Sequence, residues 1–413
     1  MEKNYQEMNT QVYFENKNNK EAMSNWLFII LIIMYTFAYN NDLRNESSLV
    51  WYAISGFTIA YLTFMIAFSS YKKQPIGVYA IWASAFFAFT FLSGAWTINE
   101  SEYFSKIKSL FLLFIVNILL SFTVETKKDI QRILFANFLA LVFYLVYVLL
   151  KVDFSQLGED RLGVDLLGSR WNANDVGIKL SCGFAFAIYY VFEKKMIAEK
   201  IFFALIGTVF AIVSFLSGSR TAFLLLVLIG VGMLFLMSKN KFLSLGIIAA
   251  FLATAYLLVM RVEPLYEVLG KRLESLIINL FGGETAEGSF DTRAEMIKLG
   301  WKAFLERPIF GYGLGGSFLL YEQELDVYTY AHNNFIETLL NGGLVGFIIY
   351  YFIYAYILVK LFKRAYFKCD KVAICLLVIN IGLLIMQIGT ITYNSTLDNS
   401  ALMLAVIYNK GEM

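Results

Sequence analysis

The pattern of apolar and polar positions divides this chain into long apolar runs separated by short polar segments. A bilayer core needs roughly 20 mostly apolar residues per helix, so the runs predict about twelve transmembrane helices. The expected spans lie near residues 25–39, 49–71, 76–94, 104–124, 132–151, 173–192, 201–217, 221–238, 242–260, 336–359, 372–391 and 398–409. Only Gly218-Ser219-Arg220 separates the seventh and eighth runs, so one long helix is an alternative there. The predicted fold is an all-α polytopic membrane protein.

Basic residues fall in alternate short loops, and this alternation predicts the orientation of the chain. The loops expected in the cytoplasm carry Lys72-Lys73, Lys127-Lys128, Lys194-Lys195, Lys239 with Lys241, and the basic cluster from Lys360 to Lys371. We therefore expect four parts: a cytoplasmic tail over 1–24, nine helices over 25–260, a structured extracytoplasmic loop over 261–335, and three helices with a short cytoplasmic tail over 336–413.

The composition supports a membrane protein and excludes several other classes. Of the 413 residues, 59% are hydrophobic and 16% are charged, against roughly a quarter charged in soluble domains. The net charge of +2 gives no indication of nucleic acid as a partner. Three cysteines without a C-x-x-C pair, and a single histidine, argue against a disulfide framework or a zinc site. The polar first 25 residues do not form a signal peptide, so we expect the first helix to insert the chain.

The outer loop over 261–331 has the periodicity of two helices. Apolar residues between Val268 and Leu280 recur at helical spacing, which predicts an amphipathic helix on the membrane surface that ends at Gly282-Gly283. A capping box predicts a second helix from Thr292 to about Glu306, before Pro308.

Two features of this loop bear on a binding site. On the second helix, Arg293 shares a face with Ile297, Gly300 and Phe304, so we expect a partly buried arginine that needs a partner. The run from Gly311 to Gly316 fits G-x-G-x-x-G, but no strand precedes it and no βαβ unit surrounds it. We interpret it as a turn for close backbone packing; an anion-binding nest is the alternative.

His332 is the single histidine and lies directly before the tenth apolar run. An imidazole can take a proton from a sugar hydroxyl, although a hydrogen-bonding residue at a helix entrance is the alternative. Asn333 and Asn334 are candidates for orienting it or for binding hydroxyls, and Glu337 is a candidate partner for an arginine. Gly342, Gly343 and Gly346 are expected to allow close helix packing.

Three arginines are candidates for binding an anion, because the planar guanidinium binds phosphate in a bidentate manner. Arg220 lies in the polar gap between two apolar runs; an interfacial arginine whose head reaches water is the alternative. Arg293 is a candidate because it falls on the buried face. Arg170 precedes a span beside Trp171, and a simple anchor is the alternative. All are predicted on the outer side, together with His332.

These motifs resemble the O-antigen ligase and O-antigen polymerase family of bacterial membrane proteins. The resemblance rests on four elements: His332-Asn333 followed after nine residues by Gly343-x-x-Gly346, Arg307-Pro308-Ile309-Phe310-Gly311-Tyr312-Gly313, Ser219-Arg220-Thr221-Ala222, and Asp291-Thr292-Arg293. Specific residues match only between about 168 and 346, while the predicted topology matches throughout. Thr221 stands where members of the family often carry glycine. This difference changes the turn but keeps the positive charge of Arg220.

The resemblance implies a GT-C-like membrane glycosyltransferase that needs neither a cofactor nor a metal. Its donor would be a glycan on undecaprenyl diphosphate at the outer face of the bacterial cytoplasmic (inner) membrane. By the same resemblance, His332 would be the general base, and Arg220 and Arg293 would bind the diphosphate. Arg170 and Asn333 are further candidates for substrate binding.

We favour a polymerase that joins repeat units into a surface polysaccharide such as O-antigen or capsule, with a chain-length regulator as a potential partner. The alternative is a ligase that moves a finished glycan to a lipid or wall acceptor. A secondary transporter or flippase is a third hypothesis, since about twelve spans are typical of transporters too. Against it, Lys179 alone is clearly intramembrane and the chain has only three prolines.

Overall fold

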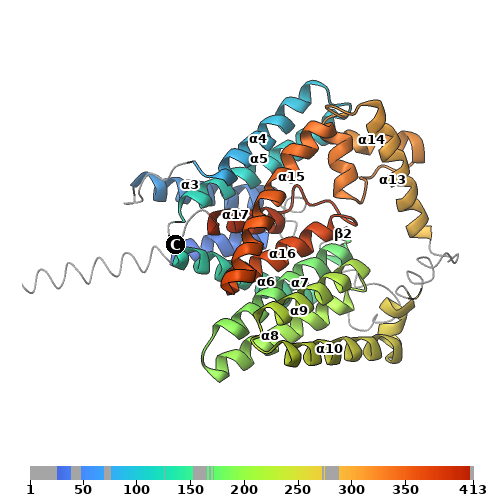
Figure 1. The fold of residues 1–413 in the computed structure, drawn as a ribbon. Helices are drawn as coiled ribbons and strands as arrows, with labels where there is room; N and C mark the ends of the chain where they lie inside the picture. Colours follow the sequence, from blue (N-terminus) through green and yellow to red (C-terminus); the bar gives the residue numbers. More distant parts are fainter. Residues whose placement is uncertain are drawn as a thin grey trace, which may run out of the picture.

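The computed structural model describes residues 26–38, 48–68, 76–124, 126–151, 165–166, 169–170, 172–271, 274 and 288–409. This part of the chain is helical almost throughout (Figure 1). Its helices are Trp26–Ala38, α3 (Ser48–Phe68), α4 (Val78–Leu92), α5 (Glu100–Phe122), α6 (Lys127–Lys151), α7 (Ala173–Glu193), α8 (Ile197–Leu216), α9 (Arg220–Met237), α10 (Lys241–Arg261), α11 (Glu263–Leu265), α13 (Gly288–Glu306), α14 (Gly316–Leu325), α15 (Asn334–Lys368), α16 (Lys371–Met386) and α17 (Thr396–Tyr408), with helical turns at Ser93–Ala95 and Tyr266–Gly270. In the described ranges the strands are β1 (Asp165–Leu166) and β2 (Ser169–Arg170), which pair antiparallel.

The apolar runs form the helices that the sequence predicts, and the chain is a multi-pass membrane protein. Within the described residues, nine helices are long and apolar enough to cross a bilayer. Three further apolar helices are shorter: Trp26–Ala38, α16 and α17. The last of these is buried along its whole length, from Thr396 to Tyr408. A short helix surrounded by protein satisfies its backbone internally and does not need to match the bilayer thickness.

The seventh and eighth apolar runs form two helices rather than one. Gly218 has a φ of 63° between α8 and α9, a conformation that favours glycine. Ser219 then caps α9, since its Oγ accepts a hydrogen bond of 3.1 Å from the N–H of Ala222. Arg220 is therefore the first residue of α9.

Helix α15 is broken at Gly343, and a loop from upstream fills the break. Gly343 has φ 59° and ψ −162°, which frees backbone groups on either side. Four hydrogen bonds join the two backbones: Tyr312 N–H to Leu340 O at 2.8 Å, Gly313 N–H to Asn341 O at 3.0 Å, Leu344 N–H to Pro308 O at 2.8 Å, and Val345 N–H to Ile309 O at 3.2 Å. The segment 308–313 thus pairs directly with the helix that follows His332.

Glycines allow this loop and helix to approach closely. A Cβ at Gly311 would lie 2.4 Å from Leu340 O, and one at Gly313 would lie 2.4 Å from the Cα of Thr97. The interpretation as a close-packing turn is confirmed. Gly342 and Gly346 face the ring of Phe89 on α4, as expected for helix packing. Gly343 has a different role, because its conformation ends one helical segment and starts the next.

The outer segment differs from the prediction at two points. Helix α13 begins at Gly288, so the predicted start at Thr292 is wrong; its end at Glu306 is as predicted. Its buried face carries Met296, Gly300 and Ala303, whereas Ile297 is exposed, so the buried face is turned by about a sixth of a turn from the predicted one. Of the predicted helix between Val268 and Leu280, most lies outside the described residues.

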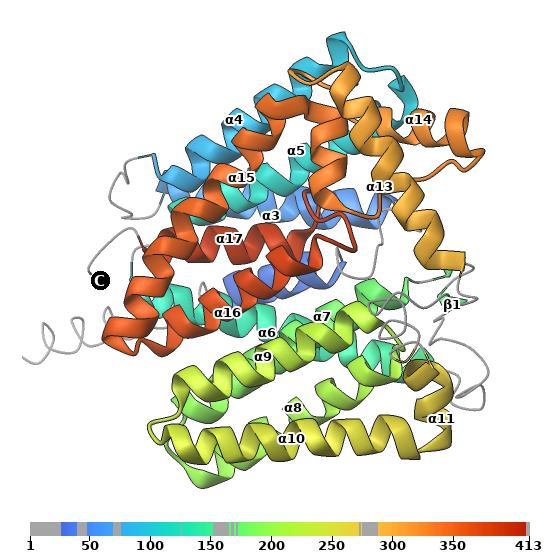
Figure 2. The same cartoon turned by 45° about the vertical axis from the view of Figure 1, so that its right-hand side comes forward.

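The helices form two groups that α16 connects. Helices α7, α8, α9 and α10 pack together, while α4, α5, α15 and α17 pack in the other group. Helix α16 contacts α7 and α9 on one side and α15 and α17 on the other. Figure 2 shows α13 extending from the neighbourhood of α14 towards β1, so its first turns lie near the ends of α7 and α9.

Candidate functional site

His332 occupies a constrained position directly before α15. Its φ is 50°, in the left-handed region that non-glycine residues seldom adopt. Its ring lies against that of Tyr330, with centroids 4.2 Å apart. The next residue, Asn333, caps α15: its Oδ1 accepts hydrogen bonds from the N–H groups of Phe335 (2.9 Å) and Ile336 (3.1 Å). The histidine therefore lies on a short, fixed connection.

Burial and the nearby cation Arg293 lower the pKa of His332 to about 4. The imidazole is therefore neutral at neutral pH and has a nitrogen lone pair that can accept a proton. A value this low makes the free imidazole a weak base. An anion that neutralised Arg293 would raise this pKa and make the base stronger.

Arg293 and Arg220 come from different helices, and their charges are near enough to interact. The pKa of Arg293 is lowered by burial first and by the charge of Arg220 second. Among the residues that the structure describes, no carboxylate lies within ion-pair distance of Arg293. Two partly buried like charges repel each other, so this arrangement favours the binding of an anion between them.

Tyr330 lies near the start of α7. Burial first and the charge of Asp175 second raise its pKa, while Arg293 and a side-chain hydrogen bond with Asn172 oppose this shift. Asn172 caps α7 through the N–H of Asn174 at 2.9 Å. The segment before His332 is therefore near the N-terminus of α7, and helix N-termini favour anions.

The start of α9 is tied to α7 by one short contact. The Oγ of Ser219 donates a hydrogen bond of 2.6 Å to Oδ1 of Asn174. This contact fixes the position of Arg220 relative to α7. Deeper in α7, Lys179 forms an ion pair of 2.5 Å with Asp175, so the intramembrane lysine noted in the sequence has a local partner.

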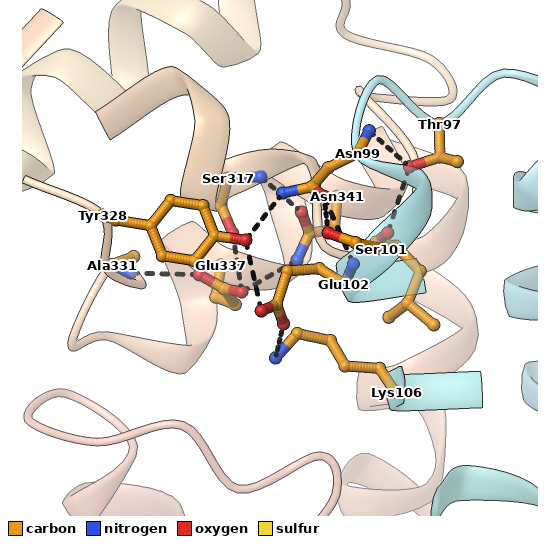
Figure 3. Close-up of polar contacts among 11 residues, drawn as sticks. Thr97, Asn99, Ser101, Glu102, Lys106, Ser317, Tyr328, Ala331, Glu337 and Asn341 are labelled. Atoms are coloured by element: carbon orange, nitrogen blue, oxygen red, sulfur yellow. Dashed lines mark hydrogen bonds and ion pairs between the residues drawn. The ribbon is translucent and has the colours of Figure 1, made fainter. Parts of the chain in front are cut away.

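Glu337 binds a set of neutral donors instead of an arginine. Its Oε1 accepts hydrogen bonds from Ser317 Oγ (2.8 Å) and Asn341 Nδ2 (2.9 Å), and its Oε2 accepts one from the N–H of Ala331 (3.0 Å) (Figure 3). The side chain is completely buried. The hypothesis of an arginine partner is therefore wrong for the described part of the chain.

The segment before His332 is held at its outer end by α5. The hydroxyl of Tyr328 donates to Oε1 of Glu102 at 3.2 Å and accepts from Nδ2 of Asn99 at 3.3 Å. Glu102 also forms an ion pair of 3.7 Å with Lys106 (Figure 3). These contacts are exposed or partly exposed, so they stabilise the segment less than the buried contacts of Glu337 do.

Asn334 is a structural clamp, which sequence reasoning did not recognise. Its N–H donates to Gln387 O at 2.8 Å, and its Oδ1 accepts from the N–H groups of Thr392 (2.9 Å) and Tyr393 (3.3 Å). Its Nδ2 donates to Tyr351 and Gln387. The side chain is fully buried, so it joins α15 to the connection between α16 and α17 and is not accessible to a substrate.

Arg170 and Asn333 are the remaining candidates for substrate binding. Arg170 belongs to β2, but its side chain lies outside the described residues. The amide oxygen of Asn333 serves the helix cap, and its amide nitrogen takes no part in that cap. Within the described ranges, no group of three or more histidine, cysteine, aspartate or glutamate residues is arranged to hold a metal ion.

A comparison with protein families locates these residues in one domain. Residues 201–351 match the family described as O-antigen ligase. The matched region includes Arg220, Arg293, His332 and Glu337, and it covers less than half of the chain. No curated protein matches the chain. The family implies membrane glycan transfer of the O-antigen ligase or polymerase type, which agrees with the resemblance found in the motifs. Residues 201–351 of this multi-pass membrane protein thus carry its similarity to the O-antigen ligase family.

Proposed function

We propose that the protein transfers a glycan from undecaprenyl diphosphate to a sugar hydroxyl, at the outer face of the bacterial cytoplasmic membrane. One observation carries this proposal. A neutral histidine, His332, lies beside a partly buried arginine, Arg293, which itself lies beside a second one, Arg220. This combination provides a proton acceptor and a binding site for a diphosphate.

The chemistry follows from the charges that change during transfer. A bond forms between the acceptor oxygen and the anomeric carbon, and the bond from that carbon to the diphosphate oxygen breaks. Negative charge then develops on the leaving diphosphate, where Arg220 and Arg293 stabilise it. His332 takes the proton of the acceptor hydroxyl. No nucleotide sugar, cofactor or metal takes part in this scheme.

Donor binding is also expected to raise the pKa of His332. The positive charge of Arg293 contributes to the low pKa of His332 in the free protein. A bound diphosphate neutralises that charge, so the pKa of His332 rises only when the donor is in place. The acceptor is thereby activated next to a bound donor.

The proposed topology places the site where a lipid-linked donor can reach it. We propose twelve spans, with the tail over 1–24 and the C-terminal end in the cytoplasm and the loop over 261–335 outside. The first turns of α13 and the N-terminal ends of α7 and α9 would then lie near the outer membrane surface. Arg170 and the amide nitrogen of Asn333 are proposed as additional contacts for the glycan.

Polymerisation of repeat units into O-antigen or capsule remains the favoured reaction, and ligation of a finished glycan to a lipid or wall acceptor remains the alternative. Deletion of the gene distinguishes them. Single repeat units attached to the final acceptor, without long chains, indicate a polymerase. Full-length chains retained on undecaprenyl diphosphate indicate a ligase. Flux of the lipid-linked glycan across liposomes without a new glycosidic bond would instead support a flippase and overturn the proposal.

A further inference from the structure

Glu337 has an environment that binding of substrate does not explain. It is a completely buried carboxylate one turn into α15. Three donors surround it, and each has a normal hydrogen-bond distance of 2.8–3.0 Å. Taking a carboxylate out of water costs several kcal/mol, so a buried acid that only filled space would be less favourable than an apolar residue.

The three contacts divide between the two oxygens of the carboxylate. Ser317 on α14 and Asn341 on α15 both donate to Oε1, which fixes the rotation of the carboxylate. Oε2 then points to the N–H of Ala331. Figure 3 shows Ala331 and Ser317 approaching Glu337 from different segments. The geometry therefore directs one oxygen at the residue that precedes His332.

The backbone at His332 needs such support. A left-handed conformation of a non-glycine residue costs roughly 1–3 kcal/mol and persists only where the surroundings hold it. Asn333 fixes the chain after His332 by capping α15. Glu337 fixes the chain before it, at Ala331.

We propose that Glu337 is a positioning residue that holds the backbone of His332 in its left-handed conformation and so aims the imidazole into the site. This inference rests on the proposed function only in giving His332 a role as a base. Glu337 acts through the Ala331 N–H and not through its charge, because the pKa of His332 responds to burial and Arg293. Among the described groups, the charge of Arg293 on α13 acts on His332 and the ring of Tyr330 contacts it. Arg220 acts in turn on Arg293, and Asp175 and Glu337 act on Tyr330.

The single histidine allows a direct test that does not depend on activity. Protein labelled with ¹³C,¹⁵N-histidine and purified through a tag without histidine gives one imidazole signal, from His332. Two variants disturb the contact to Ala331 in different ways. Glu337→Gln leaves one acceptor oxygen where the wild type uses two, and Glu337→Asp is one methylene shorter. Glu324→Gln, on the exposed side of α14, is the matched control.

In both Glu337 variants we expect the imidazole signal to shift and the titration midpoint to rise by roughly one unit or more towards the ordinary value near 6.5, because a released ring is less buried. Glu324→Gln is expected to leave both unchanged. An imidazole signal and midpoint that stay unchanged in both folded Glu337 variants would overturn the inference.

Measurements of kcat and KM test the role of Glu337 separately from the proposed function. We expect Glu337→Gln to lower kcat roughly tenfold with an unchanged KM for the donor, and to cause no further loss in a His332→Ala background. A loss of equal size in both backgrounds would show a general structural role and contradict the inference. If wild-type protein forms no glycosidic bond, the proposed function fails, and the imidazole titration still decides the role of Glu337.

Discussion

Arg220 and Arg293 come from two different helices, yet the pKa of Arg293 is lowered by burial first and by the charge of Arg220 second. Such a pair is stabilised by an anion, so both guanidinium groups should be essential for donor binding. Replacement by lysine keeps the charge and loses the bidentate geometry, whereas replacement by glutamate reverses the charge.

We predict that Arg220→Lys or Arg293→Lys lowers kcat/KM for the lipid-linked donor by about tenfold, and that the glutamate variants lower it by on the order of a hundredfold or more. The value of kcat/KM is measured from glycan transfer by the purified protein in liposomes. Arg261→Glu, exposed at the end of α10, serves as the control. Glutamate variants as active as the lysine variants would exclude the arginines from diphosphate binding.

The pKa of His332 should depend on the donor. In the free protein it is lowered to about 4 by burial and by Arg293. We predict that undecaprenyl diphosphate raises the titration midpoint of the single imidazole by roughly one to two units, because the bound anion offsets Arg293. Nuclear magnetic resonance of histidine-labelled protein gives the midpoint with and without the lipid.

The pH dependence of transfer gives a second measure of the same effect. A protonated His332 cannot accept a proton, so activity is lost as the pH falls through its pKa. The acid limb of kcat/KM reports the free protein, and that of kcat reports the complex. We therefore expect the acid limb of kcat at the higher pH. Coincident limbs would mean that the donor does not neutralise Arg293.

Gly343 should be intolerant of any side chain. A Cβ there would lie 2.3 Å from Ile309 O, and its φ of 59° with ψ −162° is available almost only to glycine. We predict that Gly343→Ala destabilises the fold by about 3 kcal/mol, measured as a fall in unfolding temperature in nanodiscs. Gly246→Ala on α10 is the matched control, because no atom lies within 4 Å of its added Cβ. That control is expected to be neutral or slightly stabilising, and a similar loss in both variants would contradict the role of the break.

Asn334 should contribute to stability rather than to catalysis. Its side chain makes four hydrogen bonds, three of them buried, and two of these are to the N–H groups of Thr392 and Tyr393. We predict that Asn334→Ala lowers stability by about 2–4 kcal/mol, since buried partners are left unsatisfied. Thr58→Ala is the control, because Thr58 donates within its own helix at 2.8 Å; it should cost less than about 1 kcal/mol. An Asn334→Ala protein with wild-type unfolding temperature would show that the clamp is unimportant.

The helices were predictable from the sequence because their signals are local. Length and apolar composition alone place the ninth run at 242–260, and α10 spans Lys241–Arg261. The separation of α8 and α9 is also encoded locally, in a glycine followed by a capping serine. The start of α13 was less predictable, since Thr292 offers a good cap but the helix continues back to Gly288.

The connections within the site were not predictable because their partners are distant in sequence. Glu337 binds Ser317 and Ala331, and no pattern in the chain indicates that these donors outcompete an arginine. The break at Gly343 depends on backbone groups supplied by the segment 308–313. The motif beginning at Arg307 and the histidine motif are therefore two halves of one structural unit.

The role of His332 is the central claim, and one assay tests it most directly. Purified His332→Ala and wild-type protein, matched for unfolding temperature, are incubated in liposomes with undecaprenyl diphosphate-linked repeat units, and the glycan products are separated by gel electrophoresis. We predict a ladder of extended chains from the wild type and a loss on the order of 10²- to 10⁴-fold in the variant. A ladder of near-normal intensity from His332→Ala would contradict a role of His332 in the transfer.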